Sequence, residues 1–410
     1  MDRPVTPTNG SRADEELRPP LTGVKVLDFT HVIAGPYCTM MLADMGADVV
    51  KIERPKIGDD LRHVGRYAGR AEHDEDYFYT VNRRKRSIVL DFAKAEDLER
   101  AYELIERADV AVFNFAPRTT EKLGFGPDVL LARNPHLVYC ALSGFGQTGP
   151  LRDRLAMDSI IQAYSGIMSV TGEPAKGPMS VGAPVADVIS GMFGAYSIVC
   201  ALMEARRTGK GAVIDVSMLE SMIAVLGPRM GETLQAGKLP DRVGNENPMR
   251  VPAGMFEASD GRYIAIMSHD QVQWLRFCKA VRRPEWIDQP RFASLRDRVR
   301  HREELHALVR ETIRTEGTAE EWNERFAAER LPCAPVNDYQ QALDLEHIRE
   351  RGLLIEVEHP KSGPITLVGP PWKWSLPQPP LTPPPVLNAD VESVAHDWFD
   401  ASAKVGPNAT

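Results

Sequence analysis

The fold is decided by residues 24–53, VKVLDFTHVIAGPYCTMMLADMGADVVKIE. Val24–Phe29 and Asp48–Glu53 are short apolar runs typical of buried strands, and Pro36–Met45 between them has the apolar content of a helix. Two strands joined through one helix form a βαβ unit, in which the strands lie parallel. This stretch therefore predicts an α/β protein built on a parallel sheet.

The same alternation of strands and helices continues along the chain. The further predicted elements are a strand at Ser87–Phe92, a helix at Ala95–Ala108, strands at Asp109–Phe115 and His136–Ser143, a helix at Val188–Met203 and a strand at Ala212–Val216. Glycines 209 and 211 are expected to end the long apolar helix. All these strands are predicted to extend one parallel sheet.

The chain has 410 residues, more than one compact core usually supports, so two domains are expected. After Gly227 the sequence carries more charge, with a hairpin pattern at Gly254–Ile266 and a charged helix at Arg300–Arg314. We predict a disordered tail at 1–20, the first part of a large domain at 21–226, a small α+β domain at 227–344 and a segment at 345–410 that returns to the large domain.

The C-terminal segment contains two predicted strands and a proline-rich run. The strands are Leu353–Val357 and Ile365–Val368, joined by a turn, and the run extends from Pro370 to Pro385. An ordered strap or linker is the favoured interpretation of the run, and polyproline recognition is the alternative.

Composition excludes several classes of protein. A net charge of -8 argues against a general nucleic-acid binder, which would carry a strongly basic face. The five cysteines are scattered singly, which suits a reducing cytoplasm and no structural zinc. The longest apolar stretch, Gly191–Met203, falls short of the ~18 residues of a membrane span. A cytoplasmic protein without a membrane partner is expected.

The first βα turn offers backbone N–H groups and a helix N-terminus to an anionic or nucleotide-like ligand. Gly35 is its one glycine, so the G-x-G-x-x-G fingerprint of dinucleotide-binding folds is missing, although Glu53 stands about where a ribose-binding acid would be. An oxidoreductase using a nicotinamide nucleotide is therefore the least favoured function.

Basic residues gather in the same half of the chain. They are Lys51, Arg54, Lys56, Arg62, Arg66 and the run Arg83–Arg86. A polyphosphate site and an ordinary solvated face both fit this cluster. Asn114, Phe115 and Lys122 follow a predicted strand end, where a loop opens onto the ligand crevice of a parallel sheet, although Phe115 also fits the core.

Asp187 is one carboxylate in the apolar, small-residue run Val181–Met192. Poor solvation suits such a group to act as a nucleophile or base, and the alternative is an N-cap of the helix that follows. Asp158 also stands at the start of an apolar helix, where it is either a second cap or a carboxylate paired with Asp187. No G-x-S-x-G motif is present to indicate serine catalysis.

Taken in order, several motifs resemble the class III CoA-transferase family, which includes formyl-CoA and carnitine CoA-transferases and the α-methylacyl-CoA racemases. The motifs are Leu21–Phe29, Ala34–Pro36, Gly46–Arg54, Asn82 with Lys85–Ser87, Asp109–Phe115, Gly144–Pro150 and Ala186–Gly191. The resemblance covers residues 21–387. It implies a Rossmann-like large domain built from both chain ends, a smaller α+β domain and an interlocked dimer, either a homodimer or a heterodimer with a homologue.

The resemblance also implies the chemistry. Asp187 matches the nucleophile, which attacks an acyl-CoA and becomes an aspartyl-CoA thioester that an acceptor acid resolves. Asp158 matches a glutamate beside the catalytic site. Contacts to coenzyme A are implied for Ala34, Arg54, Asn114, Phe115 and Lys122, of which Lys122 replaces an arginine. No permanently bound cofactor is implied, since the CoA thioester is the substrate.

Departures from the family pattern narrow the function. Met157 stands where the racemases carry a histidine base, so an acyl-CoA racemase or isomerase is the disfavoured alternative. Ile33 stands where formyl-CoA transferase has a glutamine, and no glycine-rich substrate loop is found between Asn245 and Ala265. The pattern is closer to transferases that use succinyl-CoA with a dicarboxylic or aromatic acid. A non-catalytic CoA-binding subunit is the remaining alternative, and Asp187 argues against it.

Overall fold

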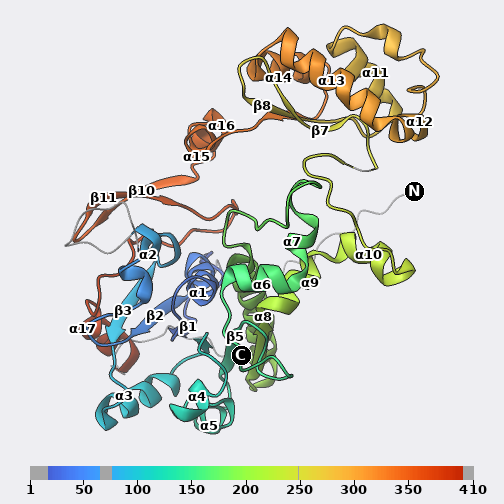
Figure 1. Cartoon of the computed structure of the whole chain (residues 1–410). Helices are drawn as coiled ribbons and strands as arrows, with labels where there is room; N and C mark the ends of the chain where they lie inside the picture. The colour runs from blue at the N-terminus through green and yellow to red at the C-terminus, as the bar shows by residue number, and fades with distance from the viewer. Residues whose placement is uncertain (1–16, 65–75, 248, 400–410) are drawn as a thin grey trace, which may run out of the picture. The chain divides into compact units, whose positions relative to one another are not determined.

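The computed structural model describes residues 17–64, 76–247 and 249–399. Most of the predicted tail at 1–20, and Arg66 of the basic cluster, lie outside these residues. The chain divides into two compact units, each described by itself (Figure 1). Unit 1 comprises Met1–Tyr164, Ala183–Val225 and Gly352–Thr410, and unit 2 comprises Ser165–Gly182 and Leu226–Arg351.

Unit 1 contains a six-stranded sheet in which every neighbouring pair is parallel. Its strands are β1 (Lys25–Asp28), β2 (Asp48–Glu53), β3 (Lys85–Val89), β4 (Val110–Phe113), β5 (Val138–Ser143) and β6 (Ala212–Ser217). The predicted α/β class with a parallel sheet is confirmed. Strand β3 begins two residues earlier than Ser87, where the prediction placed it. Its first, charged residues form ion pairs, a buried one between Lys85 and Asp28 and a partly exposed one between Arg86 and Asp48.

The strand order is β3-β2-β1-β4-β5-β6, so the winding direction reverses between β1 and β4. The register sets Val26 opposite Val49 on one side and Val110 on the other. In open parallel sheets the loops leaving the two strands at such a reversal part and leave a crevice for ligands. Here these loops begin at Phe29 and Asn114.

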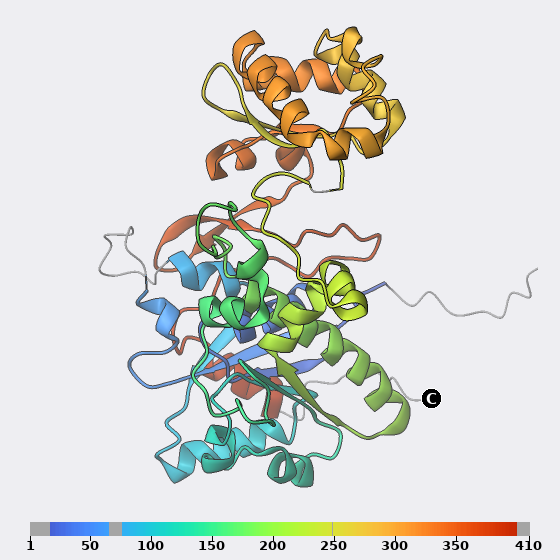
Figure 2. The ribbon, with the colours of Figure 1, turned by 45° about the vertical axis from the view of Figure 1, so that its right-hand side comes forward.

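Helices cover both faces of this sheet (Figures 1 and 2). On one face lie α3 (Ala95–Ile105) and α5 (Pro127–Arg133), and on the other lie α1 (Ala34–Asp44) and α8 (Val185–Thr208). Burial on both faces explains why the strands are continuous apolar runs rather than alternating ones. The other helices of unit 1 are α2 (Asp76–Val81), α4 (Thr119–Lys122), α6 (Asp158–Ser165), α9 (Met218–Val225), α17 (Val391–Phe399) and a 3-10 turn at Asp60–Arg62.

Helices α1 and α8 pack closely because glycines of α8 face α1. A Cβ atom on Gly191 would lie 2.6 Å from the carbonyl oxygen of Ala34 and 3.2 Å from the amide of Cys38. A Cβ atom on Gly194 would lie 3.1 Å from the Cys38 sulfur. The two backbones therefore approach more closely than any larger side chain permits.

The start of α8 differs from the prediction. The helix begins at Val185, three residues before the predicted Val188, and Pro184 is its N-cap residue. Asp187 lies inside the first turn, so the interpretation of Asp187 as a helix cap is wrong. The predicted end is confirmed, since Gly209 follows α8 in the left-handed conformation with φ 70°.

Helix α8 is also longer than the apolar stretch found in the sequence. Its 24 residues are long and apolar enough to cross a membrane by length and composition, the one such helix among the described residues. Its inner side, including Ala195 and Ile198, is buried against α1, β5 and β6. A core helix of a globular unit passes the same test, so this packing accounts for its apolar composition.

Unit 2 is built on a three-stranded antiparallel sheet of β7 (Ala253–Glu257), β8 (Tyr263–Met267) and β9 (Cys333–Pro335). The predicted hairpin is confirmed in β7 and β8. Stacked aromatic rings, among them Trp322 and Phe326, fill the core between this sheet and its helices. The helices are α7 (Ile167–Val170), α10 (Gly227–Ala236), α11 (Gln271–Ala280), α12 (Leu295–Arg300), α13 (Arg302–Glu316), α14 (Ala319–Ala328), α15 (Tyr339–Leu343), α16 (Glu346–Glu350) and a 3-10 turn at Pro284–Trp286.

The C-terminal residues of unit 1 form a hairpin of β10 (Leu354–His359) and β11 (Gly363–Val368), as predicted. The proline-rich run beyond it is ordered. Arg84 donates hydrogen bonds to the carbonyls of Pro379 and Pro380, and Arg62 donates one to Pro385 at 3.1 Å. These contacts tie the run to residues of unit 1, and its role as a strap stays a prediction.

Candidate active site

Asp187 is a half-buried acid without a cationic partner. Among the residues that the structure describes, none forms an ion pair with its carboxylate or donates a hydrogen bond to it. Burial, followed by the nearby charge of Asp158, raises the pKa of Asp187 from 3.8 to about 7. This shift moves the titration of Asp187 from the acidic to the neutral range of pH.

Asp158 caps the helix that carries Asp187. Its Oδ1 accepts hydrogen bonds from the backbone N–H groups of Ala186, at 2.7 Å, and of Asp187, at 3.2 Å. Its Oδ2 accepts a bond of 2.6 Å from Nε2 of Gln162, which is 1% exposed and lies one turn further along α6. The two predicted carboxylates are thus brought together, 29 positions apart in sequence.

The N-terminus of α8 has no spare donor in its first turn. Besides the two groups bound by Asp158, the N–H of Val185 bonds to Ala183 at 2.7 Å and that of Val188 bonds to Pro184 at 3.0 Å. A helix N-terminus stabilises an anion through unpaired N–H groups. The first turn of α8 therefore offers no unpaired N–H group to an anion.

The N-terminus of α1 is open by comparison. Its N-cap residue, Ile33, provides no side-chain hydrogen bond, and no acceptor is described for the N–H groups of Ile33, Ala34 and Gly35. Asp187 lies one helical turn before Gly191, on the face of α8 that packs against Ala34. The carboxylate and the open helix end therefore lie on the same side of unit 1.

Side chains hold the loop between β1 and α1 from both sides of the reversal point. The Asn114 amide accepts a bond from the N–H of His31 at 2.9 Å and donates one to its carbonyl at 2.7 Å. Asp59 accepts a bond from the N–H of Val32 at 3.0 Å, and Lys51 donates one to the carbonyl of Thr30 at 2.7 Å. Lys51 and Asp59 are joined by a fully buried ion pair of 2.9 Å.

Phe115 lies beside the same loop. Its ring is 5.1 Å from that of His31, and it packs against the core cluster on the α3 side of the sheet. One part of the ring therefore belongs to the core and the other borders the loop. Burial, and the charge of Lys51, lower the pKa of His31, which favours a neutral imidazole.

Arg54 and Lys122 are two exposed cations that follow strands of the sheet. Arg54 follows β2, and its guanidinium bonds to Asp60 at 2.6 Å and to the carbonyl of Gly58 while remaining half exposed. Lys122 is exposed at the end of α4, and no partner is described for it. Both cations are accessible to an anionic ligand.

The basic run Arg83–Arg86 is neither a phosphate site nor a solvated face. Arg83 and Arg84 pair with Asp44, Lys85 with Asp28 and Arg86 with Asp48 and Asp397. Glu53, at the position of a ribose-binding acid, instead pairs with Arg62 at 2.7 Å in the interior. The charged residues on and beside strands β2 and β3 are neutralised by ion pairs within unit 1. Their partners are distant in sequence, so no local pattern reveals these pairs.

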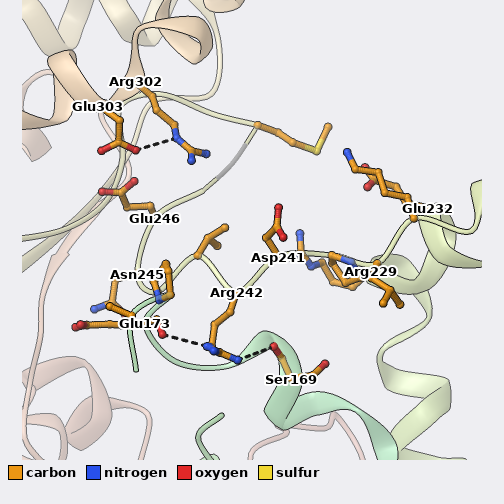
Figure 3. A pocket seen from close by; sticks show the side chains of 18 of the residues that line it. Ser169, Glu173, Arg229, Glu232, Asp241, Arg242, Asn245, Glu246, Arg302 and Glu303 are labelled. Carbon is orange, nitrogen blue, oxygen red and sulfur yellow. Dashed lines mark hydrogen bonds and ion pairs between the residues drawn. The ribbon is translucent and has the colours of Figure 1, made fainter. Parts of the chain in front are cut away.

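A separate polar pocket of about 1010 Å³ lies in unit 2 (Figure 3). It is lined largely by charged side chains, and Arg242 projects from its wall to bond with the carbonyls of Ser169, Glu173 and Lys176. None of the predicted site residues lines it. No local pattern predicts this pocket or the roles of Gln162 and Asp59, because these depend on contacts between distant segments.

Comparison with known proteins identifies the family. The profile of CoA-transferase family III matches residues 21–391. The succinyl-CoA:glutarate CoA-transferase of Mus musculus is 34% identical over 381 residues, which is 93% of this chain and 86% of the mouse protein. The acetyl-CoA:oxalate CoA-transferase of Acetobacter aceti is 37% identical over 358 residues, 87% of this chain and 89% of that protein. A solved CAIB/BAIF family protein from Brucella suis matches with a TM-score of 0.85 at 32% identity, covering 93% of this chain and 100% of its own. The chain therefore belongs to CoA-transferase family III and is an enzyme of that class.

Proposed function

We propose that this enzyme transfers coenzyme A from an acyl-CoA to a carboxylic acid through a covalent intermediate on Asp187. One observation carries the proposal: a half-buried carboxylate, free of cationic partners among the described residues, has its pKa raised to about 7. Reactive carboxylates need this environment, since an ion pair would hold the charge and lower its nucleophilicity. The names of the relatives support the same class of reaction.

The proposed reaction conserves charge at each step. The Asp187 carboxylate attacks the thioester carbonyl and the carbon–sulfur bond breaks. CoA leaves as a thiolate, and the donor acyl group is joined to Asp187 in a mixed anhydride. The thiolate then attacks the aspartyl carbonyl, which releases the donor acid as a carboxylate and leaves an aspartyl-CoA thioester. The acceptor carboxylate then attacks the aspartyl thioester, which releases the CoA thiolate and forms a second anhydride. The thiolate attacks the acceptor carbonyl of that anhydride, which gives the new acyl-CoA and restores the Asp187 carboxylate. No net proton transfer is needed, so the site requires no histidine base.

The open end of α1 is the proposed source of stabilisation for the developing oxyanions. The N–H groups of Ile33, Ala34 and Gly35 have no described acceptor, whereas the first turn of α8 has none to offer. Fixed backbone donors in a partly dry site stabilise negative charge that develops in a transition state. Ala34 therefore remains a proposed contact of the CoA thioester.

The remaining proposed contacts belong to the nucleotide end of coenzyme A. Arg54 and Lys122 are accessible cations, and Phe115 offers a partly buried ring beside His31. Phosphate groups pair with such cations, and a flat base packs on an aromatic side chain.

Succinyl-CoA is the proposed donor, with a dicarboxylic acid as acceptor. The apolar Ile33 in place of a glutamine and the naming of the mouse relative for succinyl-CoA and glutarate support this choice. The racemase alternative gains no support, because Met157 is an exposed thioether that cannot carry a proton. A screen of acyl-CoA and acid pairs decides the specificity.

We also propose that the enzyme is a dimer of identical, interlocked chains. Unit 1 exposes large apolar side chains along α6, α8 and the residues before them, among them Leu155, Met157, Tyr196 and Met203. Large exposed apolar side chains are candidates for an interaction surface. Light scattering on the purified chain measures its mass, and a pairing with a homologue would leave this chain alone as a monomer.

The covalent intermediate is tested by trapping it. The enzyme is incubated with succinyl-CoA, treated with hydroxylamine, and digested for mass spectrometry. Hydroxylamine converts the aspartyl thioester or anhydride to a hydroxamate, so the peptide containing Asp187 is expected to gain that modification. Turnover of Asp187→Asn is expected to fall by about a thousandfold or more, because a covalent step is lost.

The control is Asp128→Asn, which alters an exposed acid in the first turn of another helix, α5. It is expected to retain full turnover and the modified Asp187 peptide. Modification at another residue, or turnover that survives in Asp187→Asn, would refute the proposed mechanism.

A further inference from the structure

We propose that Asn114 is a positioning residue that pre-forms the CoA-binding loop, rather than a residue whose amide binds the ligand. The inference rests on the proposed function, because it concerns the same site. It departs from the direct ligand contact that the family resemblance implies for Asn114. The loop in question is Thr30–Ile33, between β1 and the open end of α1.

Both polar atoms of the Asn114 amide bond to the backbone of one residue, His31. Its Oδ1 accepts the N–H of His31 and its Nδ2 donates to the carbonyl of the same residue. This pairing spans the reversal point, since His31 follows β1 and Asn114 follows β4. Among uncharged side chains, asparagine and glutamine alone can accept and donate in this way. The clamp therefore explains the residue type without a ligand.

The next residue, Val32, has a strained backbone. Its φ is 65°, in the left-handed region that β-branched residues rarely adopt. Such strain persists only where the surroundings hold it, and it concentrates at functional sites. The holding contacts here are the Asn114 clamp on one side and Asp59, which accepts the Val32 N–H at 3.0 Å, on the other.

The Asp59 side of the loop is rigid. Asp59 and Lys51 are both fully buried, paired at 2.9 Å, and Lys51 also bonds to the carbonyl of Thr30. Burial by itself would raise the pKa of the Asp59 carboxyl, but Lys51 outweighs it and keeps the pKa below the usual range. A permanent buried ion pair thus fixes one flank, and Asn114 is the single side chain described as clamping the other.

This arrangement sets the orientation of the open N–H groups of α1. If the clamp is lost, Val32 can relax toward negative φ, which turns the following peptides and misdirects the donors of Ile33 and Ala34. If the loop is already ordered in the free protein, CoA binding does not have to order it, so less conformational entropy is lost on binding. Asn114 is expected to act on CoA affinity through this loop.

The experiment measures CoA binding by calorimetry and amide exchange of the loop by mass spectrometry, both on the full chain. Asn114→Leu is expected to weaken CoA binding about tenfold and to speed exchange in the peptide containing His31 and Val32 without ligand. Asn114→Asp, which keeps the acceptor and loses the donor, is expected to have a smaller effect in the same direction.

Rescue separates positioning from direct contact. Glycine adopts positive φ without strain, so Val32→Gly is expected to recover several-fold of the affinity lost in Asn114→Leu, measured against Val32→Gly alone. A direct contact predicts equal losses in both backgrounds and unchanged exchange in the free loop, and that result would overturn the proposal.

Asn134→Leu is the matched control. Asn134 also clamps backbone carbonyls, those of Ile105 and Ala108 at 2.9 and 2.8 Å, but at the opposite edge of the sheet. It is expected to lower the melting temperature without altering CoA affinity. If the wild-type chain binds no CoA, the proposed function fails, while the exchange measurement still decides whether Asn114 holds the loop.

Discussion

Two helix N-termini in unit 1 carry residues of the proposed site, and they differ in whether their backbone N–H groups are hydrogen-bonded. In the first turn of α8 every N–H group is paired within the protein, two of them with the carboxylate of Asp158. At α1 no acceptor is described for the N–H groups of Ile33, Ala34 and Gly35. Glycine 191 brings the two helices together.

The difference assigns each helix a separate task. A nucleophilic carboxylate is weakened by donors aimed at it, so the capped end of α8 leaves Asp187 poorly stabilised and reactive. An oxyanion needs donors, so the open end of α1 suits the substrate. Asp158 thus plays two roles, since it occupies the donors of α8 and adds negative charge beside Asp187.

The largest effect expected from this contrast is on stability. The pKa of Asp187 is about 7 in the folded protein and 3.8 as the ordinary value. The folded state therefore holds a proton that the unfolded chain has lost, and wild-type stability falls as pH rises between those values. At about pH 8 Asp187→Asn is expected to be more stable than wild type by on the order of 2–4 kcal/mol.

Thermal unfolding followed across pH measures this effect. The advantage of Asp187→Asn over wild type is expected to shrink as the pH falls from about 7 and to vanish below 3.8, where both states of the wild type bind the proton. A stability difference between Asp187→Asn and wild type that is constant with pH, or absent at high pH, would mean that folding does not raise the pKa of Asp187.

The second effect concerns the contact between the two helices. Gly191→Ala would place a Cβ atom 2.6 Å from the carbonyl oxygen of Ala34, so α8 must move off α1. Overpacking of this kind costs about 1–3 kcal/mol, and turnover is expected to fall with it. The control is Gly231→Ala within α10, where a Cβ atom meets nothing within 4 Å. That change is expected to be neutral or slightly stabilising.

The smallest effect separates the charge of Asp158 from its capping role. Asp158→Asn keeps an acceptor for the α8 donors but removes the negative charge, so the pKa of Asp187 should fall and more of it ionises at acidic pH. The acidic limb of the kcat/KM profile is expected to move to lower pH. Asp158→Ala should show the same shift and lose about 1 kcal/mol of stability with the cap. An unmoved profile in both variants would remove Asp158 from the tuning of Asp187.

Burial explains how much of the fold was predictable. Strand β2 was predicted at the residues where it lies, and β1, β4 and β5 within three, because strands buried on both faces are continuous apolar runs bounded by polar residues. Strand β3 was predicted too late, because its opening residues Lys85 and Arg86 look exposed while their acidic partners lie far away in sequence.

The residues of the candidate site could be predicted from the sequence, but their hydrogen-bonding partners could not. Asp187 and Asp158 stood out as lone acids in apolar surroundings, yet local pattern favoured a cap at Asp187. The cap comes instead from Asp158, 29 positions earlier, and the partner of Asn114 is a peptide 83 positions away. Such contacts depend on the packing of distant segments, which a single sequence does not reveal.

The path of oxygen during turnover tests the central claim most directly. If an acceptor acid labelled with heavy oxygen attacks an aspartyl thioester, one of its oxygens bridges the second anhydride and remains on Asp187 when CoA departs with the acyl group. After turnover with a labelled dicarboxylate and succinyl-CoA, the peptide containing Asp187 is therefore expected to be heavier by the label. A labelled acyl-CoA product together with an unlabelled Asp187 would contradict the account.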